Sequence, residues 1–214
     1  MQTKKRIILG SASPRRRELL EQIGISFEVR VSDKEEVYHS LIPEEIVKEL
    51  ALSKAKNVAD DLREKQEQVK QISFDKKNNV LLDTIVIGAD TIVVSDGSIL
   101  GKPKDEADAV RMIRSLQGRS HKVYTGVAIL DYDDEGKRKS VVHAVETEVF
   151  VNPMSDEEIR EYAATGEPLD KAGAYGIQGE FAAYIERIDG DYYNVVGLPV
   201  SYVYRQLKEI AEKD

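Results

Sequence analysis

Asp90 is the residue whose surroundings most strongly indicate chemistry, because it is a carboxylate inside an apolar run. The run, Ile85–Val94, reads IVIGADTIVV and has the composition of a strand buried on both faces. A carboxylate there is costly unless another group pairs with it, and Gly88 has no side chain to keep such a group away. An isolated buried aspartate more commonly caps a turn or pairs with a core arginine. A catalytic role therefore depends on what the rest of the chain brings to Asp90.

Three consecutive arginines, Arg15, Arg16 and Arg17, stand at the start of a predicted helix that follows a strand and a loop of small residues. A helix N-terminus offers free backbone N–H groups and a positive dipole end, which suit an anion. Cationic side chains oppose this dipole, and a bound phosphate would remove the conflict. We therefore favour a phosphate site at this loop over a solvated basic turn.

Two lysines stand where they could approach Asp90. Lys54 lies on the inward stripe of a long helix that opens at Pro43. Its ammonium could extend to the surface or point into a polar pocket, and the sequence leaves both alternatives open. Lys102 follows a tight turn and a short return strand, and Pro103 keeps it out of helical geometry. This return should bring Lys102 back toward the Asp90 strand.

The remaining polar candidates are the acidic pair Glu35 and Glu36, in a polar loop where such pairs are usually solvated, and Gln178, in a glycine-rich segment. Cations match the oxygens of a polyphosphate, and carboxylates match a hard divalent ion such as Mg²⁺. A carboxylate beside that ion can orient or deprotonate a water molecule. The sequence contains neither G-x-x-x-x-G-K-[ST] nor G-x-G-x-x-G. These residues alone indicate a hydrolase or binder of a phosphorylated small molecule.

Composition narrows the class of protein. The 214 residues are 41% hydrophobic, which is enough for a sizeable core, and the net charge of −8 argues against a general nucleic-acid binder. Without cysteines there is no thiolate nucleophile or disulfide framework, and three histidines make a His-rich zinc site improbable. We expect no signal peptide, no membrane span and a cytoplasmic location.

Alternating strands and helices must position these residues. Strands are predicted over 6–9, 27–31, 85–94, 99–100, 122–132 and 139–151, with a last hairpin of 181–188 and 192–196 around Asp189-Gly190. Helices are predicted from Pro14 to about Gly24, from Pro43, over 105–116, from the capping box at Ser155 to about Gly166, and from Pro199. We interpret the polar stretch 63–79 as a fraying helix end and an exposed loop, and His121 and His143 as structural.

Several short motifs, in order, resemble the Maf family of nucleotide pyrophosphatases and extend over nearly the whole chain. They are Ser11-Ala12-Ser13-Pro14-Arg15-Arg16, Glu35-Glu36, Lys54-Ala55, Gly88-Ala89-Asp90-Thr91, Gly101-Lys102-Pro103, Tyr124-Thr125-Gly126 and 169–179. Each motif alone is weak evidence for the family, whereas the full set in the same order is specific evidence for it. The stretch 63–79 is longer than the family pattern leads one to expect.

The resemblance implies one domain over 1–214, with two lobes around a central cleft. Its fold class would be α/β, an elongated, mixed, curved β-sheet flanked by helices, similar to inosine triphosphate pyrophosphatases. The implied reaction cleaves a nucleoside triphosphate between the α- and β-phosphates, giving the monophosphate and pyrophosphate, with a divalent cation (Mg²⁺ or Mn²⁺) as cofactor. It also favours a homodimer.

Roles follow residue by residue from the resemblance. Asp90 would be the catalytic carboxylate, acting on water as general base or through the metal, and Glu36 would help hold the metal. Triphosphate binding would fall to the Ser11–Arg16 loop and to the cations Arg16, Lys54 and Lys102. Base selection would fall to Arg15, Thr91 and Gln178.

Gly-Ala-Asp-Thr around Asp90 and the segment Tyr175-Gly176-Ile177-Gln178-Gly179 resemble the branch of the family that acts on dTTP and UTP. The Gln178 amide would offer a donor and an acceptor to a pyrimidine edge. Modified pyrimidine triphosphates are further candidate substrates. Two alternatives are 7-methyl-GTP hydrolysis within the same family and a nucleotide-binding regulator of cell division and septum formation. The regulator predicts tight binding without useful turnover.

Overall fold

The computed structural model describes residues 4–35, 37–72, 81, 83–133 and 135–213, with only the backbone for 66–72. One sheet organises this part of the chain, in the order β2-β1-β3-β5-β6-β7 with β4 beside β3. Its strands are β1 (Arg6–Leu9), β2 (Glu28–Val29), β3 (Thr84–Ser95), β4 (Ser98–Leu100), β5 (Ser120–Tyr132), β6 (Arg138–Val151) and β7 (Ile185–Asp189). Strand β1 pairs in parallel with β2 and β3, and the other pairs are antiparallel. The expected mixed α/β class is confirmed.

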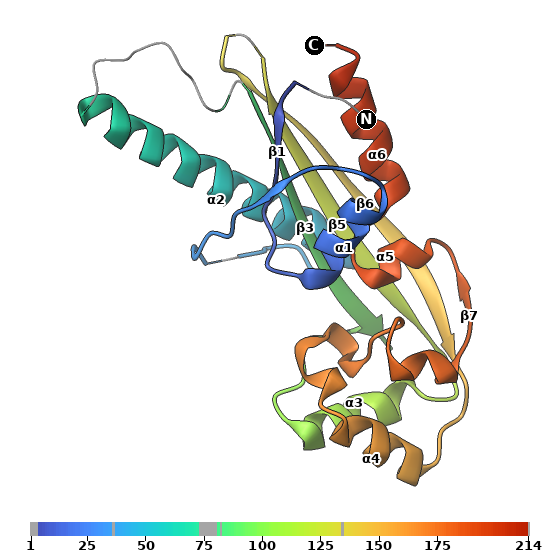
Figure 1. Cartoon of the computed structure of the whole chain (residues 1–214). Coiled ribbons are helices and arrows are strands. Elements are labelled where there is room, and N and C mark those ends of the chain that lie inside the picture. Colours follow the sequence, from blue (N-terminus) through green and yellow to red (C-terminus); the bar gives the residue numbers. More distant parts are fainter. Residues whose placement is uncertain (1–3, 36, 73–80, 82, 134, 214) are drawn as a thin grey trace.

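The long strands β3, β5 and β6 run through the length of an elongated molecule, and helices gather at its two ends (Figure 1). Toward one end lie α2 (Pro43–Ile72) and α6 (Val200–Ala211), while α1 (Pro14–Gln22) lies nearer the middle (Figure 1). At the other end lie α3 (Glu106–Leu116) and α4 (Asp156–Ala164), with the short 3₁₀ helices 167–170, 172–174 and 180–184. Helix α5 (Tyr192–Val196) lies against the middle of the sheet (Figure 1).

Helix α2 packs on its face of the sheet with its backbone in direct contact with two glycines. A Cβ atom at Gly88 would overlap the carbonyl oxygen of Ala51 and lie 2.7 Å from the backbone nitrogen of Ala55. A Cβ atom at Gly126 would overlap the carbonyl oxygen of Val47 in the same way. The glycine in the Asp90 strand thus permits the close approach that the sequence predicts.

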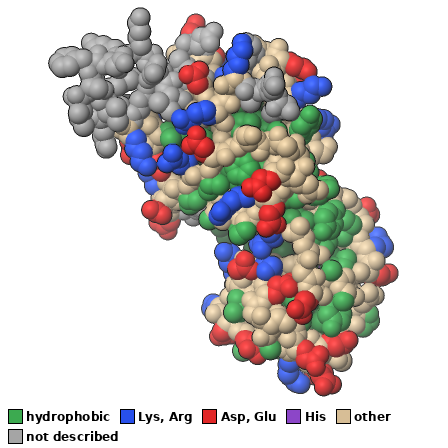
Figure 2. Space-filling model, viewed as in Figure 1, with side chains coloured by type: hydrophobic (Ala, Val, Ile, Leu, Met, Phe, Trp, Pro, Cys, Tyr) green, Lys and Arg blue, Asp and Glu red, His purple; other side chains and the backbone are tan. Residues whose placement is uncertain are grey.

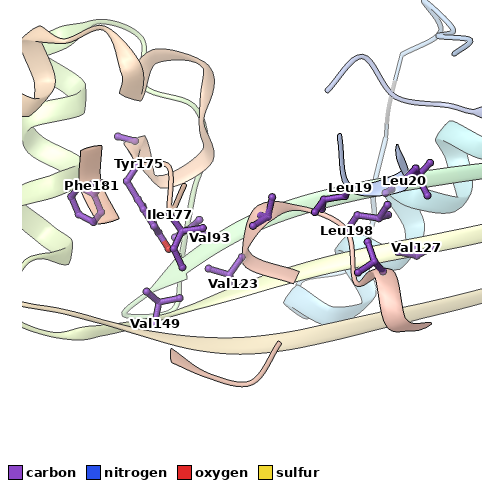
Figure 3. Close-up of a cluster of buried hydrophobic side chains, with 14 of the residues drawn as sticks. Leu19, Leu20, Val93, Val123, Val127, Val149, Tyr175, Ile177, Phe181 and Leu198 are labelled. Carbon is purple, nitrogen blue, oxygen red and sulfur yellow. The ribbon is translucent and has the colours of Figure 1, made fainter. Parts of the chain in front are cut away.

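The opposite face carries a hydrophobic core that continues along the strands (Figure 3). Toward one end, Leu19, Leu20 and Leu198 pack near Val127. Toward the other, a cluster forms around Phe181, from side chains that include Val93, Val123, Val149, Tyr175 and Ile177. Because this core is continuous, the elements at both ends are anchored to the same three strands. In the described residues, no helix is both long enough and apolar enough to span a membrane.

Local signals place several element boundaries correctly. The turn after β3 has positive φ at Asp96 (49°) and Gly97 (74°), as expected for a tight hairpin. The capping box of α4 forms, because Ser155 Oγ accepts from the Glu158 N–H while the Glu158 carboxylate accepts from the Ser155 N–H. Gly24 has φ of 71° just beyond α1.

Two predicted elements differ. Strand β2 covers only Glu28–Val29. Helix α2 continues to Ile72, through the first part of the stretch 63–79, and residues 73–79 of that stretch lie outside the described residues. The last predicted hairpin is wrong. Phe181 lies in a 3₁₀ helix and β7 pairs with β6, while 192–196 form α5. The side chain of Asp191 caps α5 by accepting from the Tyr193 N–H at 2.8 Å.

Candidate active site

The site lies on an open edge of β3. Strand β1 pairs with residues 84–87 and β4 with residues 93–95, and no other described strand pairs with 88–92 on that edge. A cavity of about 610 Å³ opens at this gap. Figure 2 shows basic and acidic side chains gathered where the surface is hollowed between the two ends. Eight of the nine residues predicted for the site line this cavity: Ser11, Arg15, Arg16, Lys54, Asp90, Thr91, Lys102 and Gln178.

Asp90 and Lys54 form a short ion pair in the cavity. Lys54 Nζ lies 2.6 Å from Asp90 Oδ1, and the two side chains are 19% and 16% exposed. Asp90 faces α2 because it has the same parity along β3 as Gly88, and it lies opposite Gly126 in the register with β5. The glycine contacts of α2 therefore bring Lys54 to Asp90. Of the two alternatives for Lys54, the structure has the ammonium in the polar pocket.

Arg16 reaches the cavity from the other face of the sheet. It is 8% exposed, and its Nε donates to the Gly197 carbonyl at 2.8 Å. Nη1 donates to Ser11 Oγ and Nη2 to Thr91 Oγ1, both at 3.0 Å. The guanidinium is thus oriented by three oxygens from three segments. Ser11 also accepts from the Ser13 N–H at 3.3 Å, which shapes the loop before α1.

A buried polar chain continues from Thr91 into α5. Thr91 Oγ1 lies 2.9 Å from Thr125 Oγ1, and Thr125 donates to the carbonyl of Asn194 at 2.8 Å. The Asn194 amide donates to Thr147 Oγ1 at 2.8 Å and to a carbonyl of β5. Asn194 has no exposed surface. Sequence reasoning did not identify Asn194, although a polar residue flanked by apolar ones was the available signal.

The mouth of the cavity is bridged by an ion pair. Arg15 Nη1 lies 3.4 Å from Asp170 Oδ2, and Lys171 Nζ lies 2.7 Å from Asp170 Oδ1. Desolvation acts to raise the pKa of Asp170, but the hydrogen bond from Lys171 and the charges of Lys171 and Arg15 hold that pKa below its usual value. Asp170 is therefore ionised at neutral pH. The pair joins α1 to the 3₁₀ segment that follows α4.

The remaining predicted residues are placed as follows. Lys102 follows β4, and Gln178 lies in the glycine-rich segment; both line the cavity. Glu35 is exposed and is not among the lining residues. Glu36 lies outside the described residues.

The donor chemistry of the cavity suits a divalent ion that is shared with a bound polyphosphate. Among the described residues, no cluster of three or more His, Cys, Asp or Glu side chains could hold a metal by itself. Asp90 nevertheless presents a hard oxygen donor in the cavity wall. Mg²⁺ is commonly held by one or two carboxylates, several waters and phosphate oxygens, so the Asp90 carboxylate is a suitable ligand type for such an ion.

Comparison with known proteins gives matches over most of the chain. A family model described as "Maf-like protein" matches residues 6–210. A dTTP/UTP pyrophosphatase of Agathobacter rectalis is 46% identical over 204 residues, covering 95% of this chain and 97% of the relative. One from Bacillus cereus (strain ATCC 10987) is 48% identical over 208 residues, covering 96% and 90%.

A solved structure is a more distant match. The nucleoside-triphosphatase, or dITP/XTP pyrophosphatase, of Mycobacterium abscessus is 17% identical, with a TM-score of 0.32, and covers 67% of this chain and 72% of its own.

Proposed function

The chain belongs to the family of Maf-like proteins, and on this premise we propose that it is a nucleoside triphosphate pyrophosphatase that hydrolyses dTTP and UTP to the monophosphate and pyrophosphate. Relatives bearing that name are 43–48% identical over at least nine-tenths of the chain. The observation that carries the proposal is the cavity itself, where a carboxylate meets cations from several elements. Modified pyrimidine triphosphates are included as further candidate substrates.

Triphosphate binding is assigned to Arg16, Lys54 and Lys102, with the Ser11–Arg16 loop around the phosphates. These cations come from α1, α2 and the segment after β4, so they approach the cavity from different directions. Charge-assisted hydrogen bonds from such groups are among the strongest in proteins. A phosphate chain lying between them would compete with Asp90 for Lys54.

Asp90 is assigned the role of general base. Once Lys54 turns to the phosphates, the Asp90 carboxylate is available to a water molecule beside the α–β anhydride. The water adds to a phosphorus of that anhydride and gives its proton to Asp90, and the bond to the bridging oxygen breaks. Pyrophosphate then leaves, and the nucleoside monophosphate remains.

A divalent cation, Mg²⁺ or Mn²⁺, is the proposed cofactor, and Asp90 and Glu36 would hold it. When bound, such an ion polarises a phosphoryl oxygen and lowers the pKa of its bound water. This assignment is supported by the oxygen donor of Asp90 in the cavity wall.

Base selection is assigned to Arg15, Thr91 and Gln178. The Gln178 amide can offer a donor and an acceptor to the edge of thymine or uracil, which would penalise a base with the opposite pattern. Thr91 is hydrogen-bonded to Arg16 and Thr125, so its hydroxyl orients a phosphate-binding residue, and its assignment to base selection rests on the family motif alone.

Measuring pyrophosphate release from a panel of nucleoside triphosphates, with Mg²⁺ or Mn²⁺, tests the proposal. The unaltered protein should act on dTTP and UTP, and Asp90→Asn should lower kcat by at least about 10³-fold while the fold is kept. Full activity in Asp90→Asn would reject the catalytic assignment. Release from 7-methyl-GTP alone would move the protein to the other branch, and nucleotide binding without any release would favour the regulator of cell division and septum formation.

The assembly and location are also proposals. We propose one domain with two lobes around the cavity, a homodimer in solution, and action in the cytoplasm, where nucleoside triphosphate pools are found. Light scattering after size-exclusion chromatography distinguishes a dimer from a monomer.

A further inference from the structure

The segment that carries Gln178 is a four-residue turn, Gly176–Gly179. It is closed by a hydrogen bond of 3.1 Å from the Gly179 N–H to the Gly176 carbonyl, and all four residues line the cavity. A turn with two glycines has little conformational preference of its own. Something outside the turn must therefore fix the direction in which Gln178 points.

Glu167, which also lines the cavity, binds the backbone on both sides of this turn. Its Oε2 accepts from the N–H of Glu180 at 3.0 Å. Its Oε1 accepts from the hydroxyl of Tyr162 at 2.9 Å, and that hydroxyl accepts from the N–H of Gly176 at 3.3 Å. One carboxylate thus holds the residue after the turn directly and the first residue of the turn through a single hydroxyl.

The fit between the carboxylate and the turn is close. A Cβ atom at Gly179 would overlap the carboxylate of Glu167, and one at Gly176 would lie 3.2 Å from Glu167 Oε1. Tyr162 is 3% exposed and its ring packs on Phe181, with centroids 5.1 Å apart. Glu167 and Tyr162 together form a brace for the turn, and this brace rests on the core beneath it. An unpaired carboxylate or hydroxyl there would be costly.

We propose that Glu167, acting with Tyr162, is a positioning residue for base selection, because it fixes the 176–179 turn so that Gln178 faces the nucleobase. The inference rests on the proposed pyrophosphatase function and adds a residue to it. Selection by paired hydrogen bonds requires the reading group to be held to a fraction of an ångström. The phosphate-binding residues contribute separately to the cleavage step. Loosening the turn should therefore reduce discrimination between bases more than it reduces the rate of cleavage.

Steady-state kinetics on dTTP and dCTP test this inference with the variants Glu167→Gln and Tyr162→Phe. Tyr162→Phe removes the hydroxyl and with it two hydrogen bonds, to Glu167 and from the Gly176 N–H. Glu167→Gln keeps the shape of the side chain but replaces one accepting oxygen of the carboxylate with an amide donor. We expect the ratio of kcat/KM for dTTP over dCTP to fall about tenfold, mainly through KM for dTTP. In combination with Gln178→Ala, Glu167→Gln should lower the ratio little further, because the two residues act on one interaction. Glu180→Gln is the matched control, since it also removes one negative charge, from an exposed side chain next to the turn.

The outcomes separate the inference from the function beneath it. A ratio unchanged in both variants, or an equal loss for dTTP and dCTP, would assign Glu167 to stability alone and overturn the inference. Additive losses in the double variant would do the same. Failure of the unaltered protein to release pyrophosphate from any nucleotide would instead reject the proposed function, and the inference would fall with it.

Discussion

Arg16 holds a fixed orientation because oxygens from three separate segments accept hydrogen bonds from its guanidinium. Those oxygens belong to Gly197, Ser11 and Thr91, and they surround the planar group at 2.8–3.0 Å. A lysine has no planar fork and could satisfy only part of this set. The arrangement makes Arg16 a preorganised cation in the cavity wall, which lowers the entropic cost of binding an anion there.

His121 is a second buried polar residue beside the site, and it behaves as a neutral group. It is 3% exposed, and its Nε2 lies 2.7 Å from the hydroxyl of Tyr175, the residue before the 176–179 turn. Desolvation lowers the pKa of His121 from 6.5 to about 4. The folded protein therefore binds this proton less readily than the unfolded chain does.

The stability of the fold should fall as pH decreases from 7 to 4.5, partly because of His121. The unfolded chain takes up the proton below pH 6.5, whereas the folded protein does so only near pH 4, so stability present at neutral pH is lost between these values. We expect the unaltered protein to lose about 2 to 3 kcal/mol more than His121→Gln over this range. Urea unfolding of both proteins at several pH values measures this difference. Parallel curves of unfolding free energy against pH would contradict the prediction.

The residue types in the sequence predicted several members of the site. They did not predict the hydrogen bonds that hold these residues in place, because those depend on tertiary contacts. Asp90, Lys54 and Lys102 could be assigned to one site because each is anomalous in its local sequence. Glu167 could not be, because its contacts cross 13 residues to a backbone N–H, and nothing in its own neighbourhood distinguishes it from a solvated glutamate. Asn194 was also missed although its apolar neighbours were an available signal, and its partners in β5 and β6 are 71 and 47 residues away in the sequence.

At the scale of elements, the distance between α2 and the sheet decides where Lys54 lies. The helix backbone touches the strands at Gly88 and Gly126, and Gly126 is opposite Asp90. Any side chain at these positions would separate the layers. The two glycines therefore serve the site as well as the packing of the core.

Gly126→Ala should disturb both stability and catalysis. The new methyl group would meet the backbone of Val47 and lie 2.9 Å from the nitrogen of Lys48, so the helix itself must move. We expect a loss of about 2 to 3 kcal/mol in the free energy of unfolding. A displacement of Lys54 by about 1 Å would also lower kcat/KM by about 10²-fold. Denaturant unfolding and dTTP kinetics measure the two effects.

The control for this substitution is Gly101→Ala, since no atom would lie within 4 Å of its methyl group and its backbone has no positive φ. It should change stability by less than about 0.5 kcal/mol. Equal stability losses in the two variants would show that the helix contact is not the cause.

Helix α5 is an element whose type the sequence pattern predicted wrongly. The sequence YYNVV is aromatic and β-branched, which favours a strand. The cap at Asp191 and the burial of Asn194 against β5 select a helix instead. Strand preference is strongly dependent on context, so a five-residue element of this kind is decided by its tertiary contacts. The long strands and the long helix, which repeat their pattern many times, were predicted correctly.

At the scale of the whole molecule, charge is distributed unevenly. The protein carries a net charge of −8, yet cationic side chains outnumber acidic ones in the cavity. The cations are Arg15, Arg16, Lys54, Lys102 and Lys171, and the acids are Asp90, Glu167 and Asp170. A negatively charged surface keeps polyanions at a distance, while a cationic cavity attracts a small triphosphate. We therefore expect this charge distribution to favour a single nucleotide over a long nucleic acid.

Asp170 forms an ion pair with Arg15 at the mouth of this cavity, and its carboxylate also repels a triphosphate. The pair is partly exposed, so it contributes little to stability. We expect Asp170→Asn to leave the fold intact and to lower KM for dTTP about two- to fivefold at low salt, because Arg15 and Lys171 then face the substrate without a competing anion. The effect should shrink as ionic strength rises, since screening weakens both forces.

Asp96→Asn provides the control for charge alone. Asp96 is 69% exposed, pairs with Arg119 outside the cavity, and lies at a turn position that asparagine tolerates. This variant changes the net charge equally and should leave KM for dTTP unchanged. If both variants lower KM alike, the long-range field of the molecule is responsible. If Asp170→Asn raises KM, the ion pair between α1 and the segment after α4 is needed to shape the mouth for the nucleotide.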